Sequence, residues 1–356
     1  MPAERSMTAD NARQPSYERQ WQSLMRSLIL PIFIFALLSP FPVSAQTALT
    51  ILHTSEHRGT IQPIDHGVFT GQGGVERRAS LIKQVRKEVE HLLVVDSGNL
   101  LMGTAISTVY KGEADIATMN VMGYDAVAVG NYDFDFGTRH LKSLHKAAVF
   151  PFLCSNVRPQ EPDTCTRYAI KTLGTLRIGL IALIGRRSYR NTFNRAVVRE
   201  VEFQDPIAAA KKTAEELRDR VDLLVAITHQ DTEEDLALAK EVPALDVIIG
   251  GHTEGFEGLV LPGATAPIEG RVEPAGAGPV FVKTHRRGRT LGRLDLVIHD
   301  KTIMVAEARN LPVTPTVPSD QEIAKLVQGF AKKLDTKTNA VIGEAMQPDA
   351  PTPPTR

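Results

Sequence analysis

The stretch Leu49-Thr50-Ile51-Leu52-His53-Thr54-Ser55-Glu56-His57-Arg58-Gly59 decides the fold of this chain. Residues 49–53 have the pattern of a short β-strand. The residues that follow place a carboxylate, an imidazole and a guanidinium side by side, from Glu56 to Arg58. In open α/β sheets, ligands bind where loops follow the carboxyl ends of strands. The stretch therefore predicts a strand that delivers ionisable side chains to the edge of a sheet.

Four more segments repeat this arrangement. Strands are predicted at residues 92–95, 126–129, 223–228 and 246–250, and the polar segments 96–99, 131–135, His229 and 251–254 follow them in turn. Because all five polar segments follow strand ends, we expect them to form one shared site rather than five independent loops.

Helix-like segments separate these strands. Helices are predicted over residues 73–91, 114–122, 138–147, 206–220 and 233–240, and Asp205 is placed to cap the fourth of them. A strand is predicted at 150–157, a β-hairpin at 168–185 with its turn at Leu173-Gly174-Thr175, and strands alone from 280 to 306. This alternation is typical of the α/β class, in which helices cover sheets.

The polar segments resemble the motifs of 5′-nucleotidases and related calcineurin-like metallophosphoesterases in order and spacing. The opening stretch matches the first block of that family. The other matches are Gly98-Asn99 for Gly-Asp, Gly130-Asn131-Tyr132-Asp133 for Gly-Asn-His-Asp, His229 for the isolated histidine, Gly251-His252-Thr253-Glu254 for Gly-His-x-His, and the closing Leu291-Gly292-Arg293-Leu294. The resemblance covers residues 49–311. It implies an α/β fold, a metallophosphoesterase-type sandwich of two mixed β-sheets flanked by helices.

In that family, two divalent ions activate a hydroxide and clamp the phosphate oxygens during in-line attack. The resemblance implies that the ligands of the second metal survive here as Asn131, His229 and His252, with Asn99 as a fourth ligand in one alternative. The other family positions have changed. Glu56, Arg58 and Glu254 replace an aspartate and two histidines of the first metal site, Asn99 replaces the bridging aspartate, and Tyr132 replaces the catalytic histidine before a retained Asp133.

These replacements alter the chemistry that the site can perform. Arg58 stays protonated and cannot donate a lone pair to a metal, whereas Glu56 and Glu254 remain able to bind one. A tyrosine phenol, unlike an imidazole, is a poor proton shuttle at neutral pH, which weakens the case for catalysis by Tyr132. We therefore expect one divalent ion (Mn, Zn, Fe or Mg) and doubt a two-metal centre.

Two hypotheses address the altered positions. In the first, Arg58 occupies the place of the first metal, held between Glu56 and Glu254 as a guanidinium–carboxylate cluster. In the second, each side chain is solvated separately after a loss of activity. His57, one residue from the expected histidine, offers a substitute ligand only if the register slips.

A phosphate ester or another small anion is the expected partner of this site. Arg58, Asn131 and Arg286 are the candidates for holding it, the last of them within the basic segment His285-Arg286-Arg287-Gly288-Arg289. A solvated turn is the alternative reading of that segment. Acidic and basic residues balance at 41 each, so net charge gives no reason to expect a nucleic acid as partner.

The first 45 residues have the pattern of a secretory signal. Arg26 precedes an apolar run at residues 28–38, and Val43-Ser44-Ala45 offers a small-residue cleavage site. The run is short and contains Pro31, so we expect no stable membrane anchor. The mature protein is expected to begin after Ala45 and to be periplasmic or secreted.

An oxidising compartment would permit a disulfide between Cys154 and Cys165. The alternative is that Cys154, which follows an apolar run, is a buried thiol.

The predicted domain limits are 1–45 for the N-terminal extension and signal peptide, 46–312 for the metallophosphoesterase-like domain and 313–356 for a C-terminal helix and tail. The helix is predicted to begin at Ser319 with one apolar face, which either packs back on the domain or meets a partner. In the family it would lead into a nucleotide-binding domain, which we expect to be absent.

Two function classes follow. One is a metal-dependent hydrolase of phosphoric esters with weak or lost activity. The other is a non-catalytic protein that uses the same cleft to bind an anion, a ligand or a protein partner.

Overall fold

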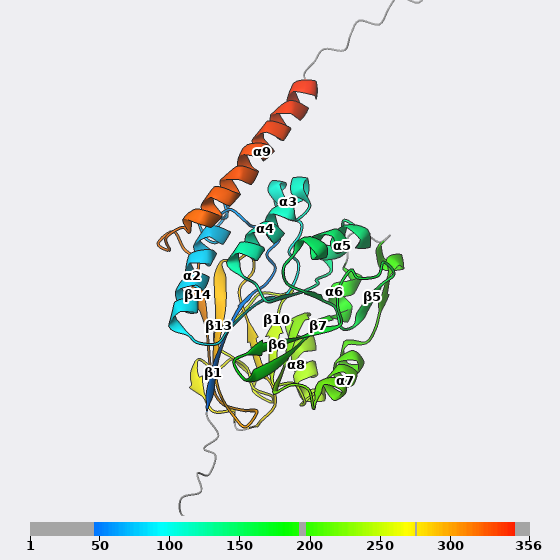
Figure 1. The fold of residues 1–356 in the computed structure, drawn as a ribbon, viewed down its shortest axis with the longest axis vertical. Helices are drawn as coiled ribbons and strands as arrows, with labels where there is room; N and C mark the ends of the chain where they lie inside the picture. Colours follow the sequence, from blue (N-terminus) through cyan, green and yellow to red (C-terminus); the bar gives the residue numbers. More distant parts are fainter. Residues whose placement is uncertain (1–45, 192–196, 275, 346–356) are drawn as a thin grey trace, which may run out of the picture. The chain divides into compact units, whose positions relative to one another are not determined.

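Two β-sheets lie face to face at the centre of the computed structural model, which describes residues 46–191, 197–274 and 276–345 (Figure 1). The predicted signal peptide, its cleavage site and the last residues of the tail lie outside this range. The larger sheet has seven strands in the order β11-β14-β13-β1-β2-β3-β4. Its strands are β1 (Thr47–Thr54), β2 (Leu92–Asp96), β3 (Ala126–Ala128), β4 (Phe152–Leu153), β11 (Gly270–Val272), β13 (Thr290–His299) and β14 (Thr302–Pro312).

The smaller sheet has five strands in the order β12-β10-β9-β7-β6. These are β6 (Tyr168–Leu173), β7 (Leu176–Ile184), β9 (Leu223–His229), β10 (Val247–Gly250) and β12 (Val280–Lys283), and a separate pair consists of β5 (Val157–Pro159) and β8 (Val201–Phe203). In both sheets parallel strands are combined with an antiparallel neighbour: β13 beside β1 in the larger, and β6 beside β7 in the smaller.

Helices cover the outer faces of both sheets. The helical segments are α2 (Val75–Glu88), α3 (Ala105–Tyr110), α4 (Glu113–Met122), α5 (Thr138–Ala147), α6 (Arg186–Arg190), α7 (Pro206–Leu217), α8 (Thr232–Glu241), α9 (Gln321–Ala345) and the 3₁₀ turns η1 (Tyr132–Phe134) and η2 (Val197–Glu200). One apolar cluster joins α2, α4, α5 and α9 to the larger sheet, and another joins α7 and α8 to the smaller.

The layer between the sheets is a continuous apolar core. Ile51 and Leu93 of the larger sheet and Val225 and Val247 of the smaller are fully buried in it. Removing this apolar surface from water stabilises the face-to-face packing. The predicted sandwich of two mixed sheets flanked by helices is therefore confirmed.

Local predictions hold where the sequence carries a specific signal. The Asp205 carboxylate accepts a hydrogen bond from the Ala208 amide at 2.9 Å and caps α7, as predicted. The single strand predicted at 150–157 is wrong, because β4 and β5 are separated there. The Ser155 hydroxyl and the Asn156 amide oxygen accept hydrogen bonds from β7 amides, at 2.9 and 2.8 Å, in place of a continuing ladder.

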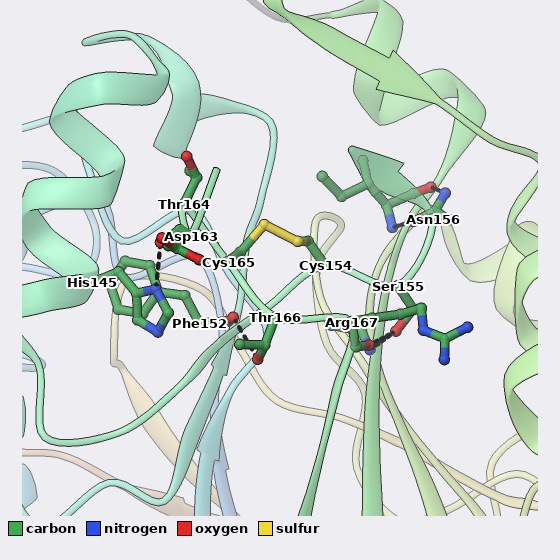
Figure 2. Close-up of a disulfide and its surroundings, with 12 residues drawn as sticks. His145, Phe152, Cys154, Ser155, Asn156, Asp163, Thr164, Cys165, Thr166 and Arg167 are labelled. Atoms are coloured by element: carbon green, nitrogen blue, oxygen red, sulfur yellow. Dashed lines mark hydrogen bonds between the residues drawn. A yellow bond between two sulfur atoms is a disulfide. The ribbon is translucent and has the colours of Figure 1, made fainter. Parts of the chain in front are cut away.

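The two cysteines form a disulfide, which settles the alternatives left by the sequence. Figure 2 shows the bond between Cys154, just after β4, and Cys165, with 5.9 Å between their Cα atoms. Beside it, the Ser155 hydroxyl donates to the Arg167 carbonyl at 2.6 Å. The bond closes the excursion that contains β5 before the chain enters β6.

The apolar face of α9 packs back on the domain. Ile323 and Val327 are buried against the cluster that includes α2 and α4. The Tyr110 hydroxyl of α3 donates to the Phe330 carbonyl at 3.1 Å, and the two rings meet edge to face. None of the helices in the described residues has the length and apolar character needed to cross a membrane. The domain limits at 45 and 312 stay predictions.

Candidate functional site

Five strand ends bring polar side chains together at one edge of the two sheets. They are Glu56 after β1, Asn99 after β2, Asn131 after β3, His229 at the end of β9 and His252 after β10. The Asn99 amide donates to Glu56 Oε1 at 2.6 Å, and His229 Nε2 lies 3.1 Å from Asn131 Oδ1 and 3.2 Å from His252 Nδ1. The shared site expected from the sequence pattern is thus present.

Main-chain hydrogen bonds hold the first two loops of this site against each other. The amides of Glu56, Arg58 and Gly59 donate to the carbonyls of Gly98, Asn99 and Leu100 at 3.1, 2.9 and 2.7 Å. Glu56, Arg58 and Asn99 all have positive φ, at 50°, 48° and 58°. Non-glycine residues in this region carry strain that commonly accompanies functional sites.

Asp133 fixes the loops rather than facing the site. Its carboxylate accepts hydrogen bonds from the amides of Asn99, Leu100, Leu101 and Gly130, at 2.7 to 3.1 Å. Burial raises the pKa of Asp133 to about 7 against the opposing effect of these amide donors. The carboxylate of this predicted catalytic residue is therefore bound to main-chain amides.

Asn99 presents its nitrogen, not its oxygen, to the site. Its Oδ1 accepts a hydrogen bond from the Tyr132 amide at 2.9 Å, while its Nδ2 donates to Glu56. In this orientation the Asn99 side-chain oxygen points away from the site, so Asn99 does not serve as the fourth metal ligand that the sequence suggested as one alternative. The side chain of Tyr132, the other predicted catalytic residue, has its ring centroid 4.6 Å from the Arg58 guanidinium.

Glu56 is the centre of the charge arrangement. Its side chain is fully buried, and its Oε2 accepts from Arg58 Nε at 2.5 Å and from Arg286 Nη2 at 3.2 Å. The first half of the cluster hypothesis holds, because Arg58 does pair with Glu56. Its second half is wrong: Glu254 pairs with His285 Nδ1 at 2.9 Å and Arg289 Nη2 at 2.7 Å. The turn after β12 supplies these two partners and holds Glu254 at the exposed rim.

The imidazoles of His229 and His252 are both neutral. His229 Nδ1 lies 2.7 Å from the Ser97 carbonyl, which can only accept, so this nitrogen carries the proton and Nε2 carries a lone pair. Burial lowers the pKa of His229 to about 3 and that of His252 to about 4, where the neighbouring His229 adds to the effect. Both imidazoles therefore stay neutral, with a single ring proton, at neutral pH.

These residues fit one divalent ion. Glu56, His229 and His252 each offer a ligand atom, and the three atoms lie within 4.8 Å of one another. The His229 lone pair faces Glu56 Oε1 at 3.4 Å, so two buried acceptors meet without a proton between them. A cation satisfies such a pair, and carboxylate with imidazole suits Zn, Mn or Fe. Among the residues that the structure describes, no first metal site forms beside it, because Arg58 lies against Glu56 Oε2 and Glu254 pairs with His285 and Arg289 at the rim.

His57 does not replace the missing histidine. It is buried on the helical side of the sheet, where Nε2 lies 3.0 Å from Asp115 Oδ1 and Nδ1 lies 3.2 Å from Arg78 Nη2. The register of the strand-to-loop segment has not slipped.

Sequence reasoning missed Lys283. It ends β12, its side chain is fully buried, and its Nζ donates to Thr253 Oγ1 at 2.6 Å and Thr232 Oγ1 at 3.1 Å. Asp235 lies 3.7 Å away and supplies the counter-charge. Lys283 thereby joins the segments that follow His229 and His252. The sequence did hold a signal for this residue: Lys283 directly follows the apolar run 280–282, just as polar residues follow the other strands of the site.

Comparison with known proteins agrees with this geometry. The chain is 29% identical over 317 residues to the snake venom 5′-nucleotidase of Gloydius brevicauda, an alignment that covers 84% of this chain and 53% of that protein. It is similar to the crystal structure of a 5′-nucleotidase precursor from Thermus thermophilus, with a TM-score of 0.72, 27% identity, and coverage of 82% of this chain and 59% of the other. No family model matches the chain.

A third comparison bears on the fold alone. The calcineurin-like phosphoesterase YfkN from Bacillus subtilis superposes with a TM-score of 0.66 at 23% identity, over 82% of this chain and 98% of that structure. The chain spans about half the length of the snake venom relative it matches. The chain is thus similar in sequence and structure to 5′-nucleotidases, and it has the fold of the calcineurin-like phosphoesterases.

Proposed function

We propose that this protein is an exported metallophosphoesterase of the 5′-nucleotidase type that binds one divalent ion and a phosphate-bearing ligand, with a low capacity to hydrolyse phosphoric esters. The observation that carries the proposal is the position of Glu56. One of its oxygens faces the two neutral imidazoles, and the other is bound by Arg58 and Arg286.

The metal would be held by Glu56, His229 and His252. Bound there, a divalent ion would polarise a phosphoryl oxygen of an ester. Arg58 and Arg286 supply guanidinium donors suited to phosphate oxygens. They remain 21% and 36% exposed, so a ligand can reach them from solvent.

Low turnover follows from what the residues can do with protons and charge. Asn99 is neutral where the relatives' motif has an aspartate, and Asp133 is bound to main chain rather than to an imidazole. Tyr132 stands in for the acid–base histidine, and a phenol transfers protons less readily than an imidazole does. These features favour slow hydrolysis over a fast two-metal reaction.

A non-catalytic binding function is the second candidate. The observation that favours it is the direct contact of Arg58 with Glu56. The guanidinium is a permanent positive charge in the place where a second metal would otherwise bind. In that case the site would bind a phosphate-bearing or other anionic ligand without turning it over.

Export is supported by the disulfide between Cys154 and Cys165, since disulfides persist mainly in oxidising compartments. Cell fractionation with N-terminal sequencing of the mature chain tests it. A cytoplasmic, uncleaved protein would contradict export.

Metal analysis and a phosphate-ester assay in Mn²⁺ test the catalytic proposal. The natural protein is expected to bind one equivalent of metal and to turn over a generic ester slowly. The matched comparison is the variant Arg58→His, Asn99→Asp, Tyr132→His, Glu254→His, which should bind a second equivalent and hydrolyse the ester faster.

The outcomes separate the candidates. One equivalent of metal with no turnover, restored by the fourfold variant, supports the binding protein. Fast turnover by the natural protein, unimproved in the variant, contradicts both candidates. A His229→Ala variant that keeps its metal would contradict the site itself.

A further inference from the structure

Glu56 divides its carboxylate between two binding functions. Oε2 accepts from Arg58 Nε at 2.5 Å and from Arg286 Nη2 at 3.2 Å. Oε1 accepts from the Asn99 amide at 2.6 Å and lies 3.4 Å from His229 Nε2 and 3.9 Å from His252 Nδ1. One buried negative charge thus serves the guanidinium pair on one side and the imidazole pair on the other.

The charges around Glu56 do not balance locally. Two guanidiniums face one carboxylate, which leaves one positive charge in excess beside a fully buried anion. The nearby carboxylates have other partners: Glu254 pairs with His285 and Arg289. Asp231 lies 3.7 Å from His252 Nε2 and 3.4 Å from Arg187 Nη1. Because each guanidinium has five N–H donors, Arg58 and Arg286 keep donors to spare after binding Glu56.

From this geometry we propose that metal and anion bind cooperatively, with Glu56 as the coupling group. The inference rests on the proposed one-metal site and adds its regulation: each ligand tightens the other. Without metal, Glu56 partly neutralises the two guanidiniums and weakens their attraction for an anion. A divalent ion at Oε1 engages that negative charge and raises the local positive charge.

The same argument runs in the other direction. An anion on Arg58 and Arg286 screens them from the metal, so the like-charge repulsion that opposes metal binding falls. Linkage requires the two effects to be equal: the factor by which metal tightens the anion is the factor by which the anion tightens the metal. Coupled sites typically show factors of about 5 to 150, and we expect at least about 10 here at low salt.

The chemical class of the anion follows from the donors. Two guanidiniums with planar, paired N–H groups favour a tetrahedral dianion or a carboxylate that accepts two hydrogen bonds at once. Sulfate is the probe of choice, because it is tetrahedral, keeps its charge at neutral pH and does not precipitate manganese.

Isothermal titration calorimetry on the chelator-treated full-length protein measures the complete cycle. The four titrations are MnCl₂ alone, sulfate alone, sulfate with saturating Mn²⁺ and Mn²⁺ with saturating sulfate, all in chloride buffer of constant ionic strength. The expected result is one Mn²⁺ per chain and a sulfate affinity that rises at least about 10-fold with metal, matched by an equal rise in metal affinity.

Variants identify Glu56 as the coupling group. In Glu56→Gln, metal binding should weaken, metal-free sulfate binding should tighten and the coupling factor should fall to about 1. Glu257→Gln is the matched control, since Glu257 lies on the same rim beside His285 but is not bound to Arg58 or Arg286. It should leave the factor unchanged.

The wild-type cycle tests the coupling even if Glu56→Gln fails to fold. Binding of one Mn²⁺ with identical sulfate affinity in its presence and absence would overturn the coupling and leave the one-metal site standing. Binding of no Mn²⁺ at all would overturn both. A coupling factor that survives intact in folded Glu56→Gln would overturn the role of Glu56.

Discussion

Replacing Lys283 by methionine is expected to lower the free energy of unfolding by about 3–5 kcal/mol at pH 8. The substitution keeps the length of the side chain and removes a fully buried charge that lies 3.7 Å from Asp235. At an effective dielectric constant of about 20, the Coulomb attraction over this distance is about 4 kcal/mol. The variant also loses the donors to Thr253 and Thr232, and it leaves the Asp235 carboxylate buried without a cation.

The loss should depend on pH in a defined direction. Burial raises the pKa of Asp235 to about 6, and Lys283 is the largest opposing influence. Without Lys283 this pKa rises further, so the carboxyl group is neutral in the fold at pH 5. A carboxyl group with a raised folded-state pKa contributes stability at low pH and loses it as the pH rises. The penalty of Lys283→Met should therefore be smaller at pH 5 than at pH 8.

Urea unfolding followed by circular dichroism measures both effects. The double variant Lys283→Met, Asp235→Asn should recover most of the loss, because no unpaired charge stays buried. Lys171→Met is the matched control: Lys171 pairs with Asp125 at the surface, and its loss should cost less than about 1 kcal/mol. A Lys283→Met variant within about 1 kcal/mol of wild type at pH 8, or a double variant no better than the single, would refute the reasoning.

Three further predictions concern features outside this pair. Replacing Cys154 and Cys165 by alanine should cost about 3 kcal/mol by the chain-entropy model for a separation of 11 residues, and an unchanged urea midpoint would contradict it. Burial lowers the pKa of His53 from 6.5 to about 3, so the free energy of unfolding should fall by about 2 kcal/mol through this residue between pH 8 and pH 5. His53→Leu should reduce this dependence of stability on pH. Parallel pH profiles of the variant and the natural protein would contradict the prediction. Asp205→Ala should cost about 1 kcal/mol through loss of the bond to the Ala208 amide, and Asp205→Asn, which keeps an acceptor, should cost less than half as much in the same urea assay.

The sequence predicts the fold well where periodicity and caps act locally. The apolar runs of β1, β2 and β9 and the Asp205 cap depend on neighbouring residues, and each lies where the sequence indicates. The short helices α3 and α6 were not predicted, because five or six residues carry too little periodicity to identify a helix.

The sequence predicts which side chains gather at this edge but not how they group. It assigns Glu56 to the first metal site and His229 and His252 to the second, whereas the structure places the three together. The partner of Glu254 depends on a turn 31 residues away, where His285 approaches it. Whether the Asn99 amide turns oxygen or nitrogen inward depends on the Tyr132 amide, which is a tertiary contact. These pairings depend on contacts between loops that are far apart in the sequence.

The loops after β1 and β2 have a consequence for how this site can change. Their path is held by main-chain hydrogen bonds from the amides of residues 56, 58 and 59 to the carbonyls of residues 98–100 in the loop after β2, and by the main-chain amides that donate to the Asp133 carboxylate. Main-chain bonds of this kind do not depend on which side chain an altered position carries. Side-chain replacements at these positions can therefore remove or restore metal ligands and proton donors while the backbone of the two loops keeps its path.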